Sequence, residues 1–482
     1  MVLKTLFKNN KIVSITLFLL IFILNYFLKI IYLDSQPFWY DEIISVKDTL
    51  LDFGHIKHES EWDTNPPFYY YSLWVWCKMF GISEFSVRLM SVIFSSLATA
   101  TLFIYTKKFL NVFLSFGVSL LFTFHSFIFY FSHEARCYSL LLFLIIATVI
   151  VFHNFQKRPT HLNALFLGLL NFLIIYTHYI AGLVVFFQFV IFLIFYRNYF
   201  KEFSLSFLLT LILILLRFTK KQFGLLFSFH STSVNKSWIK LSDYNDLTTL
   251  LSKFLIHPSF YLIVLIICIS SVYFYFGNQK SYSLEQKSNF AYIFLCGFGS
   301  IIIFFIIGLV SPVFIDRYII FSIPFLLILF GYSLFNIHKY ASLIIIPILC
   351  IQLSNLNFKE PKSMDYRTTA YVVKKFSFKK PMVILQTKDI TGLFAYYYDQ
   401  PSFIDYKHLN ERLAKNNIFD IRTVEDLNLL NFKNQNTIVF CQTFEKSEDS
   451  KLIFDLFKEA GFVYVTSTAV KGVKISLMKK RL

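Results

Sequence analysis

Charged residues are scarce in this chain. Asp, Glu, Lys and Arg make up 16% of its 482 residues, whereas a soluble globular protein carries about a quarter. The six cysteines show no CxxC spacing, so they predict neither a disulfide framework nor a metal site. Glycine is also rare, with 14 residues, and this does not favour the Gly- and Pro-broken helices of many transporters. The composition argues against an ordinary soluble protein and against a disulfide-stapled secreted domain.

Hydrophobic residues are abundant and fall into long blocks. They make up 56% of the chain, with 62 Phe among them, and a helix needs about 20 apolar residues to cross the hydrocarbon core of a membrane. The first block, Ile12 to Leu33, is too long for a signal peptide and has no small-residue cleavage site after it. We interpret it as a retained transmembrane helix.

The spacing of the apolar blocks predicts an all-α polytopic membrane domain with about eleven transmembrane helices. We expect them at residues 12–33, 85–106, 112–131, 138–155, 162–178, 181–196, 203–218, 259–276, 290–310, 317–335 and 340–354. The net charge of +17 is then explained by basic residues that flank these blocks, and no nucleic-acid partner is predicted.

Lysines precede the first block and acidic residues follow it, which predicts a cytoplasmic N-terminus in the cell (inner) membrane. The basic loops at Lys107-Lys108, 156–158 and Arg197-Asn198 then fall inside, as the positive-inside rule prefers. The lysine-rich segment 219–257 falls outside, against the rule. Its lysines either face an anionic ligand or lipid, or the predicted topology is wrong there. An odd number of spans places the C-terminus outside.

The composition changes after about residue 355. Short β-rich runs such as Met382–Gln386 and Thr437–Gln442 alternate with helical patterns such as Ser450–Glu459. We therefore expect two domains. Residues 1–354 form a transmembrane domain, with a first extracytoplasmic loop at 34–84, and residues 355–482 form an extracytoplasmic α/β domain.

Short polar and aromatic motifs lie in the first loop and at the ends of later spans. They are Phe38-Trp39-Tyr40-Asp41-Glu42, Asp63-Thr64-Asn65-Pro66-Pro67-Phe68-Tyr69-Tyr70, Phe80-Gly81-Ile82-Ser83-Glu84 with Arg88, His133-Glu134-Ala135-Arg136-Cys137-Tyr138, Thr177-His178-Tyr179, Asp316-Arg317-Tyr318 and Asp365-Tyr366-Arg367. Each motif is weak alone. In this order, over most of the chain, they resemble the bacterial relatives of dolichyl-phosphate-mannose protein mannosyltransferases. These enzymes belong to the GT-C superfamily, as does the lipid A aminoarabinose transferase.

The resemblance implies a glycosyltransferase that uses a polyprenyl-phosphate-linked sugar at the extracytoplasmic face. It implies that Asp41 is the catalytic base, with Glu42 in the same acidic pair, and that Asp63 helps to position the acceptor. Many relatives have His or Lys just before Pro-Pro, whereas this chain has Asn65, so the resemblance implies no proton role for that position here.

The chemistry of the residues agrees with this expectation. Displacement of a polyprenyl phosphate needs a base on the acceptor and positive charge on the departing phosphate. The predicted topology brings Asp41, Arg136, His178 and Arg317 to one membrane face, and Arg binds two phosphate oxygens while staying charged. We expect Arg317, Arg136 and Tyr318 at the donor phosphate, and His178, Tyr179 and Tyr138 at the substrate. A single attack with one base would invert the anomeric centre.

Several alternatives stay open. Asp41 is also a favoured helix cap, Glu42 and Asp63 are also ordinary solvated loop residues, and the arginines and His178-Tyr179 are also ordinary interfacial anchors. A transporter or flippase of lipid-linked glycans is the alternative function, and a non-catalytic scaffold is a third. The Asp41-Glu42 pair could hold a divalent cation, although no metal-ligand spacing requires one. The sequence does not distinguish a lipid, glycan or protein acceptor.

Overall fold

The computed structural model describes residues 11–59, 65–222, 239–255, 261–278, 282–338, 340–356, 364–376, 381–386, 391–443 and 448–481. The chain divides into two compact units. The first, which we call the helical unit, comprises the residues up to 31 with 53–76 and 86–356. The second, the sheet unit, comprises 32–52, 77–85 and 357–482. Each unit is described by itself.

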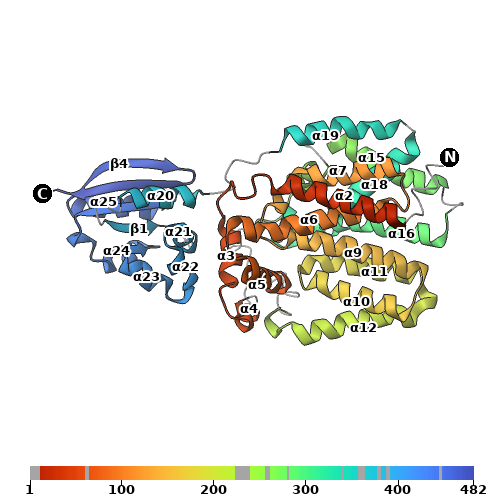
Figure 1. Ribbon diagram of the computed structural model, residues 1–482, viewed down its shortest axis with the longest axis horizontal. Coiled ribbons are helices and arrows are strands. Elements are labelled where there is room, and N and C mark those ends of the chain that lie inside the picture. The colour runs from red at the N-terminus through yellow and green to blue at the C-terminus, as the bar shows by residue number, and fades with distance from the viewer. Residues whose placement is uncertain are drawn as a thin grey trace. The chain divides into compact units, whose positions relative to one another are not determined.

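The helical unit consists almost entirely of apolar helices (Figure 1). Its elements are α2 (Lys11–Ile30), α4 (Phe53–Glu59), α5 (Phe68–Phe80), α6 (Glu84–Thr106), α7 (Val112–Phe124), α8 (Ser126–Ser132), α9 (Tyr138–Lys157), α10 (His161–Ile175), η1 (Tyr179–Ala181), α11 (Gly182–Phe195), η2 (Arg197–Tyr199), α12 (Phe200–Arg217), α14 (Tyr244–Phe254), α15 (Tyr261–Asn278), α16 (Leu284–Phe294), the π-helical turn η5 (Leu295–Gly299), α17 (Ser300–Val310), η6 (Asp316–Ile319), α18 (Ser322–Ile337), η7 (Ala341–Ile344) and α19 (Ile345–Ser354). The last residues of α5 and the first of α6 fall in the sheet unit.

Each of the eleven predicted spans coincides with an apolar helix or a bent helix pair. Within the described residues, five helices are long and apolar enough to cross a membrane, or six if the bent pair α7–α8 is one span. Five shorter apolar helices account for the other ranges, namely His161–Ile175, Tyr179–Phe195, Tyr261–Gly277, Ser322–Ile337 and Ala341–Ser354. The chain is a multi-pass membrane protein, and the count of eleven crossings stays a prediction.

The predicted span 112–131 is bent by 61° at His125. The backbone of this buried residue leaves the helical region, with φ −58° and ψ 118°. Its Nε2 lies 3.2 Å from the carbonyl oxygen of Phe254, far along the chain. The apolar pattern runs through the bend without a Pro or Gly at its centre, so the sequence predicts one helix where the structure has two.

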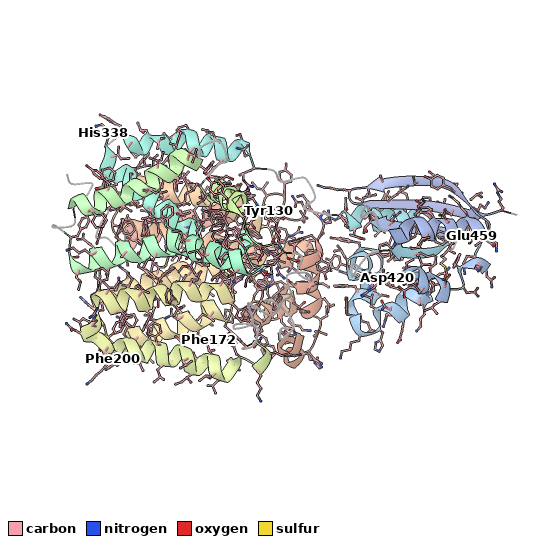
Figure 2. All side chains as sticks on the ribbon, turned by 180° about the vertical axis from the view of Figure 1, so that it is seen from behind. Tyr130, Phe172, Phe200, His338, Asp420 and Glu459 are labelled. Atoms are coloured by element: carbon pink, nitrogen blue, oxygen red, sulfur yellow. The ribbon has the colours of Figure 1, made fainter. Side chains whose placement is uncertain are left out.

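In the helical unit, α10 lies side by side with α9 and α12 (Figure 1). Gly168 of α10 permits the contact with α12, because a Cβ at this position would lie 2.6 Å from the backbone oxygen of Ser206. The Thr210 hydroxyl of α12 also donates to the Gly168 carbonyl, at 3.1 Å. Figure 2 labels Phe172 on α10 and Phe200 at the start of α12.

The sheet unit contains one five-stranded mixed sheet with strand order β2-β1-β3-β5-β4. Its elements are α3 (Tyr40–Asp48), α20 (Tyr366–Phe376), β1 (Met382–Gln386), α21 (Thr391–Tyr398), α22 (Gln400–Ile404), η9 (Tyr406–His408), α23 (Leu409–Lys415), β2 (Ile418–Asp420), α24 (Val424–Leu429), η10 (Phe432–Asn434), β3 (Thr437–Thr443), α25 (Glu448–Glu459), β4 (Phe462–Val470) and β5 (Val473–Lys480). The predicted C-terminal α/β domain is present, with both predicted strands and the predicted helix in place.

The first three strands of this sheet are parallel, and β5 and β4 add an antiparallel edge. All five residues of β1 are buried, as expected for a central parallel strand with both faces covered. One core cluster joins Ile384 of β1 and Phe440 of β3 to Phe457 of α25. The edge strand β4 is mostly exposed (Figure 1).

Candidate functional site

Five polar side chains from three separate parts of the chain gather in the helical unit. We call them the arginine cluster: Arg136, Tyr138, His178, Arg317 and Tyr318. The His178 ring is close to both tyrosine rings, with its centroid 6.2 Å from that of Tyr138 and 5.2 Å from that of Tyr318. The Tyr138 phenol is within electrostatic range of both guanidinium groups. The structure therefore brings together five of the six donor- and substrate-site residues predicted for spans and their ends.

Every member of the arginine cluster stands where a helix begins or ends. Arg136 lies in the turn between α8 and α9, Tyr138 opens α9, and His178 follows α10. Arg317 and Tyr318 lie in the short helix η6, after α17 has ended. Helix ends are the positions in a membrane protein where polar side chains leave the hydrocarbon, so they suit a site that must meet both lipid and water.

Three members of the cluster, Arg136, Tyr138 and His178, are buried. Arg136 is 7% exposed and donates to the hydroxyl oxygen of Tyr70, at 3.4 Å. The Tyr138 hydroxyl is buried and has no hydrogen-bond partner among the described residues. An unsatisfied buried hydroxyl is costly, so its presence beside two cations indicates a place where a polar ligand completes the site. Tyr70 belongs to a motif noted in the sequence, but its role as the partner of Arg136 was not predicted.

The turn that carries Arg317 is fixed by its neighbour Asp316. One carboxylate oxygen of Asp316 accepts from the Arg317 backbone N–H at 2.8 Å, and the other accepts from Lys253 Nζ at 2.6 Å. Lys240, in the same segment as Lys253, forms ion pairs with Asp243 and Asp246. Two of the lysines that violate the positive-inside rule therefore have carboxylate partners within the helical unit.

Tyr179 belongs to different surroundings. Its ring centroid lies 5.8 Å from that of Phe218, and it packs against a cluster formed by Phe172, Tyr176 and Phe218. The two rings of the His178-Tyr179 pair therefore contact different neighbours. His178 is the member that reaches the arginine cluster, and the role of Tyr179 at the substrate stays a prediction.

A second group of basic residues lies at the C-terminal ends of α6 and α9. Lys107 after α6 donates to Ser14 near the start of α2, and Lys157 at the end of α9 pairs with Glu285 at 3.1 Å. Tyr138 and Lys157 are the first and last residues of α9, which has 20 residues. At 1.5 Å per residue such a helix spans about 30 Å, the thickness of a hydrocarbon core. The arginine cluster and the predicted cytoplasmic lysines therefore lie at opposite ends of a membrane-length helix.

Two of the three predicted acidic residues belong to the sheet unit. Asp41 and Glu42 lie in the first turn of α3, where Asp41 is half-buried and Glu42 fully buried. The Glu42 carboxylate accepts from the backbone N–H of Trp39 at 3.4 Å, which caps its own helix. Asp63, the third predicted acid, lies outside the described residues.

A network that sequence reasoning missed fixes the segment before α3. Arg367 donates to the Glu84 carboxylate at 2.5 Å and to the carbonyl oxygens of Asp34, Ser35 and Gln36. Although burial lowers the pKa of Arg367, the hydrogen bond to Glu84 and its charge raise it further, so the guanidinium stays charged. Both residues of the ion pair lie in the motifs singled out above, but 283 positions separate them.

Tyr397 completes this network. Its hydroxyl donates to Glu84 and accepts from the Phe38 backbone N–H at 2.7 Å. Burial, together with the charge of Glu84, raises the pKa of the Tyr397 phenol, so it stays protonated and can donate. The Phe38 ring packs against Tyr396, with centroids 5.2 Å apart. The position of α3 within the sheet unit therefore depends on C-terminal residues.

The chemistry available to these residues is acid–base and electrostatic. The described residues contain no group of three or more His, Cys, Asp and Glu side chains arranged to hold a metal ion. The helical unit offers two arginines beside hydroxyl and imidazole groups, and the sheet unit offers a half-buried carboxylate on α3. Such groups can bind a phosphate and accept a proton.

Comparisons with known proteins agree with the motifs. Residues 64–219 match the family model described as dolichyl-phosphate-mannose-protein mannosyltransferase. Two crystal structures of ArnT from Cupriavidus metallidurans, one in the apo state and one bound to undecaprenyl phosphate, resemble the chain with a TM-score of 0.56 and 12% sequence identity. Each alignment covers 96% of this chain and 97% of ArnT. None of the curated proteins matches the chain. The motif-based resemblance to dolichyl-phosphate-mannose protein mannosyltransferases is confirmed over residues 64–219, and the fold of the chain resembles that of ArnT.

Proposed function

We propose that this protein is a polyprenyl-phosphate-dependent glycosyltransferase of the membrane. The arginine cluster is the observation that carries the proposal: two guanidinium groups and a buried hydroxyl converge at one end of an ArnT-like helical unit. The ArnT structure that contains undecaprenyl phosphate supports a lipid phosphate as the ligand. The comparisons give no support to the transporter alternative.

In the proposed reaction, Arg136 and Arg317 bind the phosphate of the donor. Positive charge at this position matters most when the bond between the anomeric carbon and the phosphate oxygen breaks, because negative charge then develops on the leaving group. Arginine suits this role since its planar fork binds two oxygens. Tyr138 and Tyr318 supply hydroxyl groups to the same phosphate, and His178, close to both rings, orients them.

The acceptor hydroxyl attacks the anomeric carbon as the phosphate departs, and its proton passes to the Asp41 carboxylate. This single displacement inverts the anomeric centre. Asp41 is the candidate base because it is half-buried in the first turn of α3 and stands where the resemblance implies the base. We propose that this face is extracytoplasmic, with the N-terminus in the cytoplasm and the domain of residues 355–482 outside.

Exchange of Asp41 for Asn tests the proposal. Asn has nearly the same shape and caps a helix about as well as Asp, but it accepts no proton at neutral pH. With purified protein and a panel of undecaprenyl-phosphate-linked sugars, we expect the first-order transfer rate to fall by about 10²–10⁴-fold while donor binding is kept. Asp52→Asn is the matched control, because Asp52 is an exposed acid of the same segment.

The transfer rate of the Asp41→Asn protein distinguishes a catalytic role of Asp41 from a structural one. A folded Asp41→Asn protein that transfers sugar at the wild-type rate would show that the base is another residue, with Glu42 and Asp63 next to be tested. Absence of transfer by the wild-type protein with every donor of the panel, despite binding of undecaprenyl phosphate, would favour a transporter or flippase.

A further inference from the structure

The sheet unit contains a pocket that the proposed chemistry does not use. It has a volume of about 550 Å³, within the range of about 300–1,000 Å³ typical of small-molecule sites. It lies beyond the carboxyl end of β2, where Asp420 ends the strand (Figure 2), and one wall is α3. Crevices at the carboxyl ends of parallel strands are the usual ligand sites of open α/β sheets.

The floor of the pocket is built from residues that follow β1 and β2. The Thr391 hydroxyl, at the start of α21, donates to the Asp420 carboxylate at 2.6 Å. Next to it, Gly392 leaves room for an aromatic ring, because a Cβ there would lie 3.1 Å from the ring of Tyr406. The two neighbouring residues thus fix a carboxylate on one side of the pocket and a tyrosine on the other.

The Tyr406 ring is fixed by contacts with two neighbouring side chains. Lys47 of α3 lies over its ring, 5.2 Å from the centroid, and the Phe403 ring meets it edge-on at 5.9 Å. Tyr40, one residue before Asp41, lines the same pocket from α3. Tyrosine rings offer flat apolar faces with a polar edge, and such surfaces suit the faces of a sugar ring. The lining therefore combines ring surfaces with groups that bind hydroxyls.

Positive charge exceeds negative charge around this pocket. The basic side chains of Lys47, Lys407 and Arg422 line it, together with the acidic side chains of Asp420 and Glu411. Asp420 already accepts the Thr391 hydroxyl, and Arg422 and Lys407 are exposed to the solvent side. Positively charged side chains that line a concave site raise the local concentration of an anionic ligand.

We propose that the pocket binds an anionic saccharide, one that carries a phosphate or carboxylate group. The sugar ring lies against Tyr406 and Tyr40, its hydroxyls bind Asp420 and Thr391, and its anionic group binds Arg422 and Lys407. This saccharide is part of the acceptor, an assignment that rests on the proposed function. α3 supports it, since Tyr40 and Lys47 on the pocket wall share this helix with Asp41.

Binding is measured on the full-length protein in nanodiscs of zwitterionic lipid, with glucose 6-phosphate as the probe and with glucose and inorganic phosphate as separate arms. We expect glucose 6-phosphate to bind more tightly than either fragment, since it engages both halves of the pocket. Loss of one charge-assisted contact in Arg422→Ala should weaken it by about tenfold. The matched control is Lys458→Ala, which removes an exposed cation of the same unit outside the pocket. Gly392→Ala crowds the Tyr406 ring, which must shift by a few tenths of an ångström, and should weaken glucose 6-phosphate binding while phosphate binding is kept.

Several results would overturn the proposal. Equal binding to wild-type and Arg422→Ala protein would place the ligand elsewhere, and equal binding of inorganic phosphate and glucose 6-phosphate would show a simple anion site. Loss of sugar phosphate binding when anionic lipid is added to the nanodiscs would show that the basic residues face the membrane instead.

A transfer assay distinguishes this proposal from the proposed function. If glucose 6-phosphate binds but no sugar transfer occurs with any donor, the pocket is a saccharide site and the glycosyltransferase proposal is refuted. If transfer occurs and Arg422→Ala leaves the acceptor KM unchanged, the glycosyltransferase stands and the acceptor role of the pocket is refuted. The expected result is a raised acceptor KM, with the donor KM unchanged.

Discussion

Exchange of Arg367 for Ala should destabilise the sheet unit and loosen the segment that leads to α3. The guanidinium makes one ion pair with Glu84 and donates to three backbone carbonyls. A hydrogen bond to a charged group contributes about 1.5–3 kcal/mol when buried. The Arg367 side chain is 39% exposed, however, so water replaces part of each contact and screens the pair. We expect a total loss of about 2 kcal/mol.

Thermal unfolding of the purified protein measures this loss. In a domain of about 150 residues, 1 kcal/mol shifts Tm by roughly 2–4 °C, so the expected decrease is roughly 4–8 °C. Arg367→Lys keeps the charge opposite Glu84 but loses the forked geometry, and it should show about half the decrease. Arg481→Ala serves as the control, since Arg481 is an exposed arginine of the same unit.

A Tm for Arg367→Ala within 1 °C of wild type would refute this reasoning. It would show that the backbone carbonyls of residues 34–36 are satisfied by water at no cost, and that Tyr397 alone fixes Glu84. A decrease as large in Arg481→Ala would show a general effect of lost positive charge instead. Sugar transfer by Arg367→Ala should fall together with Tm, because this segment leads directly to the helix that carries Asp41.

Three further predictions concern the helical unit and the topology. Arg317→Ala should severely reduce kcat/KM for the donor, and Arg317→Lys should restore only part of it, since Lys lacks the bidentate fork. If the Lys variant has the donor KM and kcat of the wild-type protein, Arg317 only anchors a helix end at the membrane interface. Gly168→Leu should lower stability by about 1–3 kcal/mol through overpacking against the α12 backbone, measured by thermal unfolding, and an unchanged Tm would show that α10 and α12 are not in close contact. Reporter fusions after Asn245 and Asp420 should report the extracytoplasmic side and a fusion after Lys157 the cytoplasm; a cytoplasmic Asp420 would reverse the proposed orientation.

Most helices could be predicted because the hydrocarbon core imposes a simple rule on the sequence. A span of about 20 apolar residues is visible in composition alone, and the predicted 85–106 and 138–155 differ from α6 and α9 by at most two residues at either end. The bend at His125 could not be predicted, because it depends on the Phe254 carbonyl more than a hundred residues away. Interactions of this range leave no local pattern.

The same distinction applies to the site. Arg136, His178 and Arg317 could be grouped from the sequence because counting helices assigns each to an end of a span. The Lys253–Asp316 pair could not, since the lysine seemed only to violate the positive-inside rule. The packing of the Tyr179 ring against Phe218 could not be predicted either, because it depends on a residue about forty positions away. Its role as a substrate residue beside His178 stays a prediction.

The sheet unit shows why the two-domain interpretation of the sequence is incomplete. A linear division places residues 34–84 with the membrane helices and residues 355–482 in a separate domain, whereas 32–52 and 77–85 group with the C-terminal residues. Glu84 explains this grouping, because its carboxylate accepts from Arg367 and Tyr397 of the C-terminal part and from the backbone N–H of Phe38. The C-terminal sheet is thus part of what builds the helix that carries Asp41. If Asp41 is the base, removal of residues 357–482 should abolish transfer even though every member of the arginine cluster is retained, because α3 would lose the residues that position it.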